Sequence, residues 1–338
     1  MAEMSLGWWE EAGAEREIAV STRARLARNL ADFPFPHRAS VVERKRVAQL
    51  VREAAKVGDL APLKPYELEK LEKNQRLALV SAQRISPQMA DGTPGRWALL
   101  AADGSFSILV NEEDHLRLQA LAPGCEPQKV FERVSVAERL LARGLELAWD
   151  DRLGFLTTSL ANVGTGLRLS VLLHLPALTL LKELEPQKEA VCALGGTIRG
   201  VHGEGSLPTG ALYQISHEIT YRPENDPMLF VRSVQGAAQV LIAAEQSARE
   251  RLLVRHPYSL RTSWEQAAER IREAELLDES EALELLSNRR LSGVLALTEP
   301  LAPTEFAEAL LELGKGSGPR LGLARAALLR RYLPPSLR

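Results

Sequence analysis

The sequence predicts an α+β fold, in which an antiparallel-rich sheet flanked by helices is followed by a small all-α domain. Two strand-like runs at 97–100 and 105–110 are joined by Ala102-Asp103-Gly104, a sequence typical of tight turns. Such a hairpin indicates antiparallel pairing in the first part of the chain. Long helical patterns at 127–149 and 226–254 supply helices to cover the sheet.

The character of the chain changes near residue 255. From there on, helical stretches with short breaks follow one another, and β-branched runs are scarce. We therefore expect a catalytic domain at 1–254 and a helical domain at 255–338. No internal repeat or low-complexity segment interrupts this division.

Composition excludes several classes of protein. The 338 residues are 45% hydrophobic and 25% charged with a net charge of -2, so no global field favours nucleic acid or an anionic membrane. No uninterrupted apolar run reaches the length of a membrane span, and the first residues lack a signal-peptide pattern. The two cysteines, Cys125 and Cys192, are too few for a disulfide framework or a zinc site. These features predict a reduced, cytoplasmic protein.

The first strand is expected at 18–20, running into the arginine-rich segment 21–30. Arg23 and Arg25 are two residues apart, so on extended backbone both point to one face of a sheet, and Arg28 points to the other. Further elements are expected as a helix at 41–57, a helical region from Pro65, strands at 154–158, 169–175 and 212–215, and a glycine-dense, mobile segment at 195–206.

The segment 111–117 places three carboxylates, an imidazole and a guanidinium directly after the strand at 105–110. A charged turn that opens a helix is the simplest interpretation. A site that holds a polyanion beside a cation needs the same groups on one rigid edge. The arginines elsewhere in the chain favour the second interpretation.

Five arginines lie at expected strand ends or beside glycine-rich loops. Guanidinium groups bind phosphate oxygens in pairs, so several aimed at one place can hold a triphosphate without a Walker loop. Neither G-x-x-x-x-G-K-S/T nor the protein-kinase motif set occurs in the chain. The five residues are Arg23, Arg25, Arg117, Arg168 and Arg199.

Four segments, in this order, resemble the motifs of the guanidino (phosphagen) kinase family. They are S-T-R-A-R-L at 21–26, N-E-E-D-H-L-R at 111–117, N-V-G-T-G-L-R at 162–168 and R-G-V-H-G-E at 199–204. The short stretch before Arg23 and the helical end of the chain are similar to the bacterial protein-arginine kinase branch. That resemblance implies the guanidino kinase catalytic fold.

The resemblance also implies an activity, namely transfer of the γ-phosphoryl group of ATP to arginine side chains of proteins. The five arginines would hold the ATP phosphates, Mg²⁺ would bridge these phosphates without protein ligands, and Glu113 and Glu204 would clamp the acceptor guanidinium. Two carboxylates suit this acceptor because a guanidinium, with a pKa above about 12, is a poor nucleophile that must be oriented and deprotonated. It further implies a homodimer, an activator protein, and marking of substrates for a Clp-type unfoldase.

The chain departs from the family at two places. Ser159 occupies the position of the family's reactive cysteine, and a hydroxyl cannot carry the charge of a thiolate. We expect a slower enzyme. The branch's regulatory R-D-x-x-R-A element has Leu321 and Gly322 in place of its first arginine and aspartate when aligned on Arg325, so we assign no residue to a regulatory phosphoarginine site.

Two other functions remain open at this stage. A phosphagen kinase acting on a free small guanidine would use the same motifs, and a kinase-like adaptor would keep nucleotide binding without turnover. Among the histidines, His115 fits either a network that orients its neighbours or a proton shuttle. His174 fits a core position, and His202 lies on the mobile segment with or without a nucleotide contact.

Overall fold

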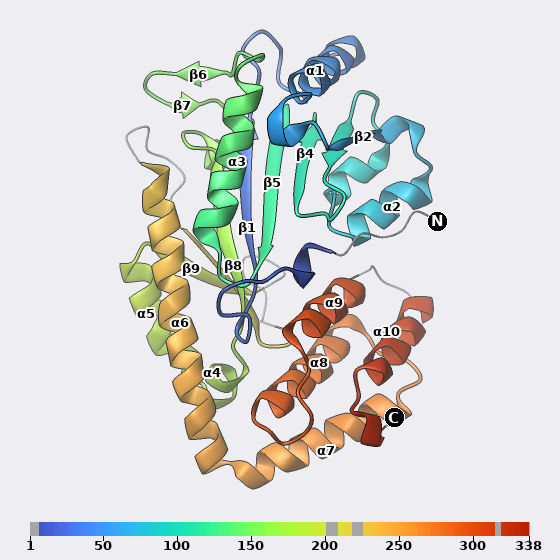
Figure 1. The fold of residues 1–338 in the computed structure, drawn as a ribbon, viewed down its shortest axis with the longest axis vertical. Helices are drawn as coiled ribbons and strands as arrows, with labels where there is room; N and C mark the ends of the chain where they lie inside the picture. Colours follow the sequence, from blue (N-terminus) through green and yellow to red (C-terminus); the bar gives the residue numbers. More distant parts are fainter. Residues whose placement is uncertain (1–6, 201–208, 218–225, 315–318, 338) are drawn as a thin grey trace.

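The computed structural model describes residues 7–200, 209–217, 226–314 and 319–337. An eight-stranded sheet forms its centre, with the order β2-β3-β4-β5-β1-β8-β10-β9 and antiparallel pairing between all neighbours (Figure 1). This confirms the predicted antiparallel-rich sheet. Its strands are β1 (Ala19–Arg28), β2 (Lys64–Glu67), β3 (Trp97–Leu100), β4 (Phe106–Val110), β5 (Leu116–Pro123), β8 (Leu167–His174), β9 (Gly196–Gly200) and β10 (Leu212–His217), and β6 (Trp149–Asp150) and β7 (Gly154–Phe155) form a separate hairpin.

Helices flank the sheet and make up the C-terminal part of the chain, as predicted. Pro residues open several of them, since the first helical position needs no backbone N–H. The helices are α1 (Val41–Ala54), α2 (Lys73–Ser81), α3 (Pro127–Leu141), α4 (Pro176–Leu181), α5 (Leu184–Ala193), α6 (Pro227–Arg255), α7 (Pro257–Glu273), α8 (Glu279–Val294), α9 (Pro303–Leu313) and α10 (Pro319–Arg331).

The helices α3 and α6 lie across one face of the sheet (Figure 1). Side chains on this face of the central strands are apolar, for example Ala24, Leu26 and Leu118, and they are buried in one core with Val134 of α3 and Leu241 of α6. Because strand residues alternate between faces, the residues between these positions point to the opposite face.

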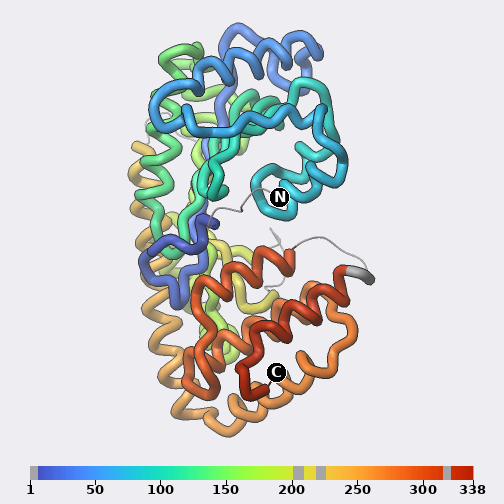
Figure 2. The backbone as a smooth tube through the Cα atoms, turned by 45° about the vertical axis from the view of Figure 1, so that its right-hand side comes forward, coloured from blue at the N-terminus to red at the C-terminus, as the bar shows by residue number. Residues whose placement is uncertain are grey.

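The C-terminal helices α7 to α10 form most of a second core, built around residues such as Trp264, Leu286 and Phe306, to which Leu212 of β10 also belongs. Figure 2 shows this region below the sheet-bearing part of the molecule. It touches the lower part of the sheet, where Leu172 packs against it and His174 Nε2 lies 2.8 Å from the hydroxyl of Ser287. Leu172 and His174 point to the same face as Arg168, since all three are an even number of residues apart on β8.

The helix α6 is long and apolar enough to cross a membrane by length and composition alone. Its N-cap Asp226 accepts a hydrogen bond from the N–H of Met228, which starts the helix one residue after the expected position. In this fold its buried side packs against α4, α5 and β8, so it serves as a core helix. Glu245, fully buried in α6, accepts hydrogen bonds from the first N–H groups of α4.

Several expected elements were wrong in type or length, among them the strand expected at 154–158, of which only Gly154–Phe155 forms a strand. The helical region expected from Pro65 begins instead with the edge strand β2, where a residue without an N–H is tolerated. The helix expected at 127–149 ends at Leu141, because Leu147 pairs with Leu30 and Trp149 pairs with Phe155.

The glycine-dense segment, expected to be mobile, starts with the strand β9, and its residues 201–206 lie outside the described residues. Glycine suits position 196 because a Cβ there would lie 3.0 Å from side-chain atoms of Val191 and Ala237. The strand β5 was not predicted, although it lies near the centre of the sheet. The segment 111–117 therefore contains the turn between β4 and β5, at 111–115, and the first two residues of β5, and it does not open a helix. Asn111 adopts a left-handed conformation with φ 58° in this turn, a geometry that asparagine accepts more readily than most residues.

Candidate active site

The register of the sheet brings the five predicted arginines to one face. Arg25 in β1 lies opposite Arg168 in β8, and Arg117 in β5 lies opposite Ala27, two residues beyond Arg25. Directly opposite residues share a face, as do residues two apart on one strand, so Arg23 joins the same row. Arg199 in β9 reaches this face through the pairs that link β9, β10 and β8.

This arginine face is the one that α3 and α6 leave uncovered. The arrangement confirms the expectation that Arg23 and Arg25 point to one side. It also confirms that Arg28 points to the other, where its guanidinium lies 2.5 Å from the carboxylate of Glu138 in α3. Alternation along an extended strand is a local property, so the sequence alone could predict it.

A cavity of about 240 Å³ lies among these residues. It brings together three of the five arginines with two other predicted residues, Glu113 and Ser159, from segments far apart in the chain. Its lining residues are Arg25, Ala27, Glu113, Arg117, Ser159, Asn162, Gly166 and Arg168. We call this cavity the anion pocket.

The arginines of the anion pocket carry more positive charge than the site neutralises. Burial, followed by repulsion from Arg23, Arg117 and Arg168, lowers the pKa of Arg25 to about 9, so its guanidinium is still protonated at neutral pH. Its Nε is buried and has no hydrogen-bond partner within the described parts of the chain. A buried donor in a field of like charges is satisfied when an anion binds, so the pocket suits a polyphosphate.

The two remaining arginines lie close enough to affect the pocket. Burial and then repulsion from Arg117 lower the pKa of Arg23. Burial and then repulsion from Arg199 lower the pKa of Arg168, while Glu113 acts in the opposite direction. All five predicted arginines therefore belong to one electrostatic cluster.

The neighbouring acids Glu112 and Glu113 have different surroundings. Glu112 is buried, lies 2.6 Å from Nη1 of Arg117 and accepts a hydrogen bond from the hydroxyl of Ser86. Glu113 lines the anion pocket, its side chain is 37% exposed, and it lies 3.6 Å from Nη2 of Arg117. Glu112 fixes Arg117, whereas Glu113 remains accessible to an incoming cation. Sequence reasoning missed the role of Glu112, since nothing in a run of acids distinguishes its members.

Asp114 ties the turn that carries Glu113 to the loop that carries Ser159. Its carboxylate accepts hydrogen bonds of 2.7 Å from the N–H of Thr158 and from the amide of Asn29. The hydroxyl of Thr158 in turn donates to the carbonyl of Glu113. These contacts fix the position of Glu113 relative to Ser159, and both residues line the pocket.

His115 belongs to the same network, which agrees with its predicted orienting role. Its Nδ1 accepts a hydrogen bond from the N–H of Leu30, so the ring proton is on Nε2 and is donated to the carbonyl of Pro34. Burial lowers the pKa of His115 to about 4. The ring is fully buried and neutral at pH 7, and it does not line the anion pocket.

Ser159 and Asn162 bracket the short 3-10 helix Leu160–Asn162 beside the pocket. The side-chain oxygen of Asn162 accepts a hydrogen bond of 3.1 Å from Nε of Arg168 and so orients this guanidinium. Asn162 was quoted within a motif but given no role. Its place as the first residue of the motif at 162–168, three residues after Ser159, was the only signal.

Two residues named from the sequence cannot be placed. Glu204 and His202 lie in 201–208, outside the described residues. His174 is buried beside Phe306, which agrees with a core position. Burial, followed by the charge of Glu126, raises the pKa of Cys125 to about 12, which agrees with a structural thiol.

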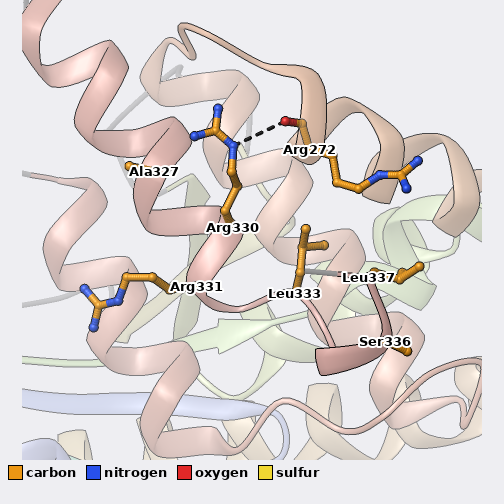
Figure 3. Close-up of a pocket in the computed structure, with 7 residues that line it drawn as sticks. All are labelled: Arg272, Ala327, Arg330, Arg331, Leu333, Ser336 and Leu337. Atoms are coloured by element: carbon orange, nitrogen blue, oxygen red, sulfur yellow. Dashed lines mark hydrogen bonds between the residues drawn. The ribbon is translucent and has the colours of Figure 1, made fainter.

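A larger cavity of about 790 Å³ lies in the C-terminal helical region (Figure 3). Three arginines line it, Arg272, Arg330 and Arg331, and we call them the helical arginine cluster. The guanidinium of Arg330 donates to the carbonyls of Arg272 and Ala274 at the end of α7. The nearby Arg325 is buried, with its Nη2 3.5 Å from Glu279. No residue of the predicted site lines this cavity.

An antiparallel sheet that presents desolvated arginines around a pocket with an accessible carboxylate defines a phosphoryl-transfer site for a cationic acceptor. Arginines can neutralise the transferred phosphoryl group, and a carboxylate can orient the acceptor and take its proton. This is the class of guanidino kinases.

Comparison with known proteins agrees with the geometry. Residues 45–248 match the family described as ATP:guanido phosphotransferase, C-terminal catalytic domain. The chain belongs to this family, as the four motifs predicted.

Its relatives include protein-arginine kinases, and the alignments with them extend over most of both chains. The chain is 33% identical over 287 residues to the protein-arginine kinase of Caldanaerobacter subterraneus, which covers 84% of each chain. It is 35% identical over 334 residues to that of an Exiguobacterium species, which covers 95% of this chain and 94% of the relative. Among solved structures, a lombricine kinase superposes with a TM-score of 0.60 at 26% identity, over 72% of this chain and 69% of the other.

Proposed function

We propose that this protein transfers the γ-phosphoryl group of ATP to the guanidinium group of arginine side chains in other proteins. The observation that carries the proposal is the convergence of Arg25, Arg117 and Arg168 with Glu113 on a single pocket. The similarity to protein-arginine kinases along most of their length supports an arginine acceptor.

The anion pocket fits the phosphate chain of a nucleotide. The repulsion between its arginines and the buried Nε of Arg25, which has no hydrogen-bond partner among the described residues, call for an anionic partner. In this proposal Arg23, Arg25, Arg117, Arg168 and Arg199 hold the phosphates. When bound with the nucleotide, Mg²⁺ would supply further neutralisation of the phosphate charge.

Glu113 is the proposed orienting group and proton acceptor. An arginine nitrogen attacks the γ-phosphorus, the N–P bond forms as the bond to the leaving oxygen of ADP breaks, and a carboxylate takes the proton of the attacking nitrogen. Glu113 suits this role since its carboxylate is accessible and Arg117 holds it at the pocket edge. Glu204 is the second acid of the proposal, carried by the family resemblance alone.

Ser159 faces the same pocket. In the proposal its hydroxyl contacts the acceptor guanidinium as a neutral hydrogen-bond partner. Without a thiolate, the bond to the cationic acceptor loses its charge-assisted part, which is worth about 1.5–3 kcal/mol. The proposed enzyme is therefore slow and still active.

Incubation with MgATP and a mixed protein lysate, followed by mass spectrometry for phosphorylated arginine, tests the proposal. We expect acid-labile phosphoarginine on proteins and little on free arginine. Phosphorylation of free arginine in preference to proteins would indicate a small-guanidine kinase, an alternative that the likeness to a lombricine kinase favours. Nucleotide binding without any phosphoarginine would indicate an adaptor.

The proposal extends to the cell. A cytoplasmic homodimer, joined through a helical domain at 255–338 that follows a catalytic domain at 1–254, would mark proteins for a Clp-type unfoldase with the help of an activator protein. Support for this extension comes from the family resemblance. Sedimentation of the full chain tests the dimer, and capture of phosphorylated substrates by an unfoldase tests the marking.

A further inference from the structure

We propose that Arg28 is a positioning residue, which fixes the loop 162–166 of the anion pocket from the opposite face of the sheet. The proposal rests on the proposed function, since it concerns the same pocket. Arg28 does not touch a substrate in this reading. It acts through the loop on Asn162 and Arg168.

The side chain of Arg28 is 3% exposed and has contacts on every side. Its Nε donates to the carboxylate of Glu138 at 2.5 Å, and its guanidinium carbon lies 3.4 Å over the ring of Phe155. The Nη1 group donates to the carbonyl of Thr165 at 2.9 Å and to that of Ala27 at 2.6 Å. The planar guanidinium thus joins α3, β7, β1 and the loop at one point.

The loop is held at neighbouring points as well. Phe155 and Gly164 exchange two backbone hydrogen bonds of 2.9 and 3.1 Å, and the N–H of Ala27 donates to the carbonyl of Gly166 at 3.0 Å. Gly166 has a φ of 61°, and a Cβ there would lie 2.6 Å from both the carbonyl oxygen of Ala27 and Nη1 of Arg28. A side chain at position 166 would therefore collide with Arg28, so the close approach of Arg28 to the loop backbone depends on Gly166.

The part of the loop that Arg28 contacts lies between two residues that line the anion pocket. Asn162 precedes Gly164 by two residues, Arg168 follows Gly166 by two, and the Asn162 side chain orients the Arg168 guanidinium. A shift of the Thr165 carbonyl changes the distance between these two side chains. A displacement of about 1 Å at a reacting site can reduce a rate on the order of 100-fold.

A direct role of Arg28 in phosphate binding does not agree with its surroundings. Its charge is balanced by Glu138, and its side chain lies on the face covered by α3. A role in stability alone would be met by apolar residues of similar volume, which often replace a buried ion pair without loss. The guanidinium instead donates from Nη1 to two carbonyls and from Nε to Glu138 at the same time. This set of contacts requires two nitrogens in a fixed planar arrangement, which arginine supplies and lysine does not.

The test compares Arg28→Met with a matched control, Arg249→Met. Arg249 is also buried and paired within 2.8 Å with a glutamate, Glu245, but it does not line the anion pocket. Calorimetry with MgADP measures the pocket without turnover. We expect Arg28→Met to raise Kd on the order of tenfold and Arg249→Met to change it less than twofold, at a similar fall in Tm.

Hydrogen exchange of the backbone supplies a readout that is independent of nucleotide. We expect faster exchange in 162–168 for Arg28→Met and for Arg28→Lys, and unchanged exchange there for Arg249→Met. Unchanged exchange in the Arg28 variants would overturn the inference, as would an unchanged Kd at a lowered Tm. Absence of MgADP binding by the wild-type protein would instead contradict the proposed function, and the exchange measurement would still decide the role of Arg28.

Discussion

The two arginine clusters of this protein differ in how their charge is balanced. In the anion pocket, Arg25, Arg117 and Arg168 project from neighbouring strands into about 240 Å³. The helical arginine cluster lines a cavity of about 790 Å³ (Figure 3). Three arginines line each cavity, and the larger cavity is the one that contains none of the predicted site residues.

The difference lies in the partners of the guanidinium groups. At the helical cluster, Arg330 donates to carbonyls at the end of α7, and Arg331 lies 3.8 Å from Glu312. Carbonyl groups at a helix C-terminus carry partial negative charge and favour such cations. On the sheet, repulsion between arginines lowers the pKa of Arg25, and its Nε has no partner among the described residues. Uncompensated, desolvated charge is what indicates an anion site.

The largest effect is expected from Arg25→Met. Loss of a desolvated guanidinium from the phosphate site should raise Kd for MgADP on the order of 100-fold. The same change removes a buried, repelled cation, so the free energy of unfolding should rise by about 1 kcal/mol. Calorimetry and urea unfolding measure the two quantities. A fall in both the affinity for MgADP and the free energy of unfolding would contradict our view that Arg25 binds phosphate at a cost to the stability of the fold.

The next effect concerns the acceptor side of the same pocket. Ser159→Cys introduces a group able to become a thiolate beside the cationic acceptor, and phosphoarginine formation should become about 10- to 100-fold faster. The nucleotide Kd should stay within twofold, since the thiol does not replace an arginine. Initial rates with one protein acceptor measure the gain. A cysteine enzyme no faster than wild type would refute this account of Ser159.

A smaller effect is expected on the free energy of unfolding when the pH is lowered and His115, near the anion pocket, becomes protonated. The folded pKa of His115, about 4, lies below its ordinary value of 6.5, so the unfolded chain takes up the proton first as pH falls. Stability from this group is complete above about pH 6.5, falls between there and pH 4, and is lower by roughly 2 kcal/mol at about pH 5.

Urea unfolding above about pH 6.5 and at about pH 5 checks this expectation. His115→Gln should lose part of the pH dependence, whereas His256→Gln, at an exposed position, should keep all of it. His174, whose pKa burial also lowers, accounts for a remaining slope in both variants. An identical pH dependence in wild type and His115→Gln would show that the buried imidazole does not titrate as described.

The smallest effect is expected from Arg331→Met in the helical cluster. Replacing this exposed side chain should change the free energy of unfolding by no more than about 0.5 kcal/mol. The Kd for MgADP should not change. A loss of nucleotide affinity near that of Arg25→Met would erase the distinction between the clusters.

Local patterns predicted the parts of the site that depend on one strand or one turn. Alternation placed Arg23 and Arg25 on one face and Arg28 on the other, and the polar run after the strand at 105–110 marked the turn with Glu113. The family motifs added Arg168 and Ser159. The direction of the arginines on β1 needs only the backbone geometry of a short segment, whereas the role of Ser159 came from the family resemblance.

Pairing between distant segments decided what the patterns missed. The helix from Pro127 stops at Leu141 because Leu147 pairs with Leu30, just after β1, and Trp149 pairs within a hairpin, which no helical periodicity reveals. The central strand β5 was missed because it follows a charged turn. Only its partners β1 and β4 define it.

The sequence by itself determined the family, the sheet-plus-helices architecture and the identity of the arginines that gather at the pocket. Tertiary structure decided which carboxylate serves which purpose, with Glu112 buried against Arg117 and Glu113 left accessible. It also decided that Arg28 holds the pocket loop from behind. The reason is physical: the direction of a side chain on a strand follows from its own backbone, whereas desolvation and charge balance depend on neighbours that only the folded chain supplies.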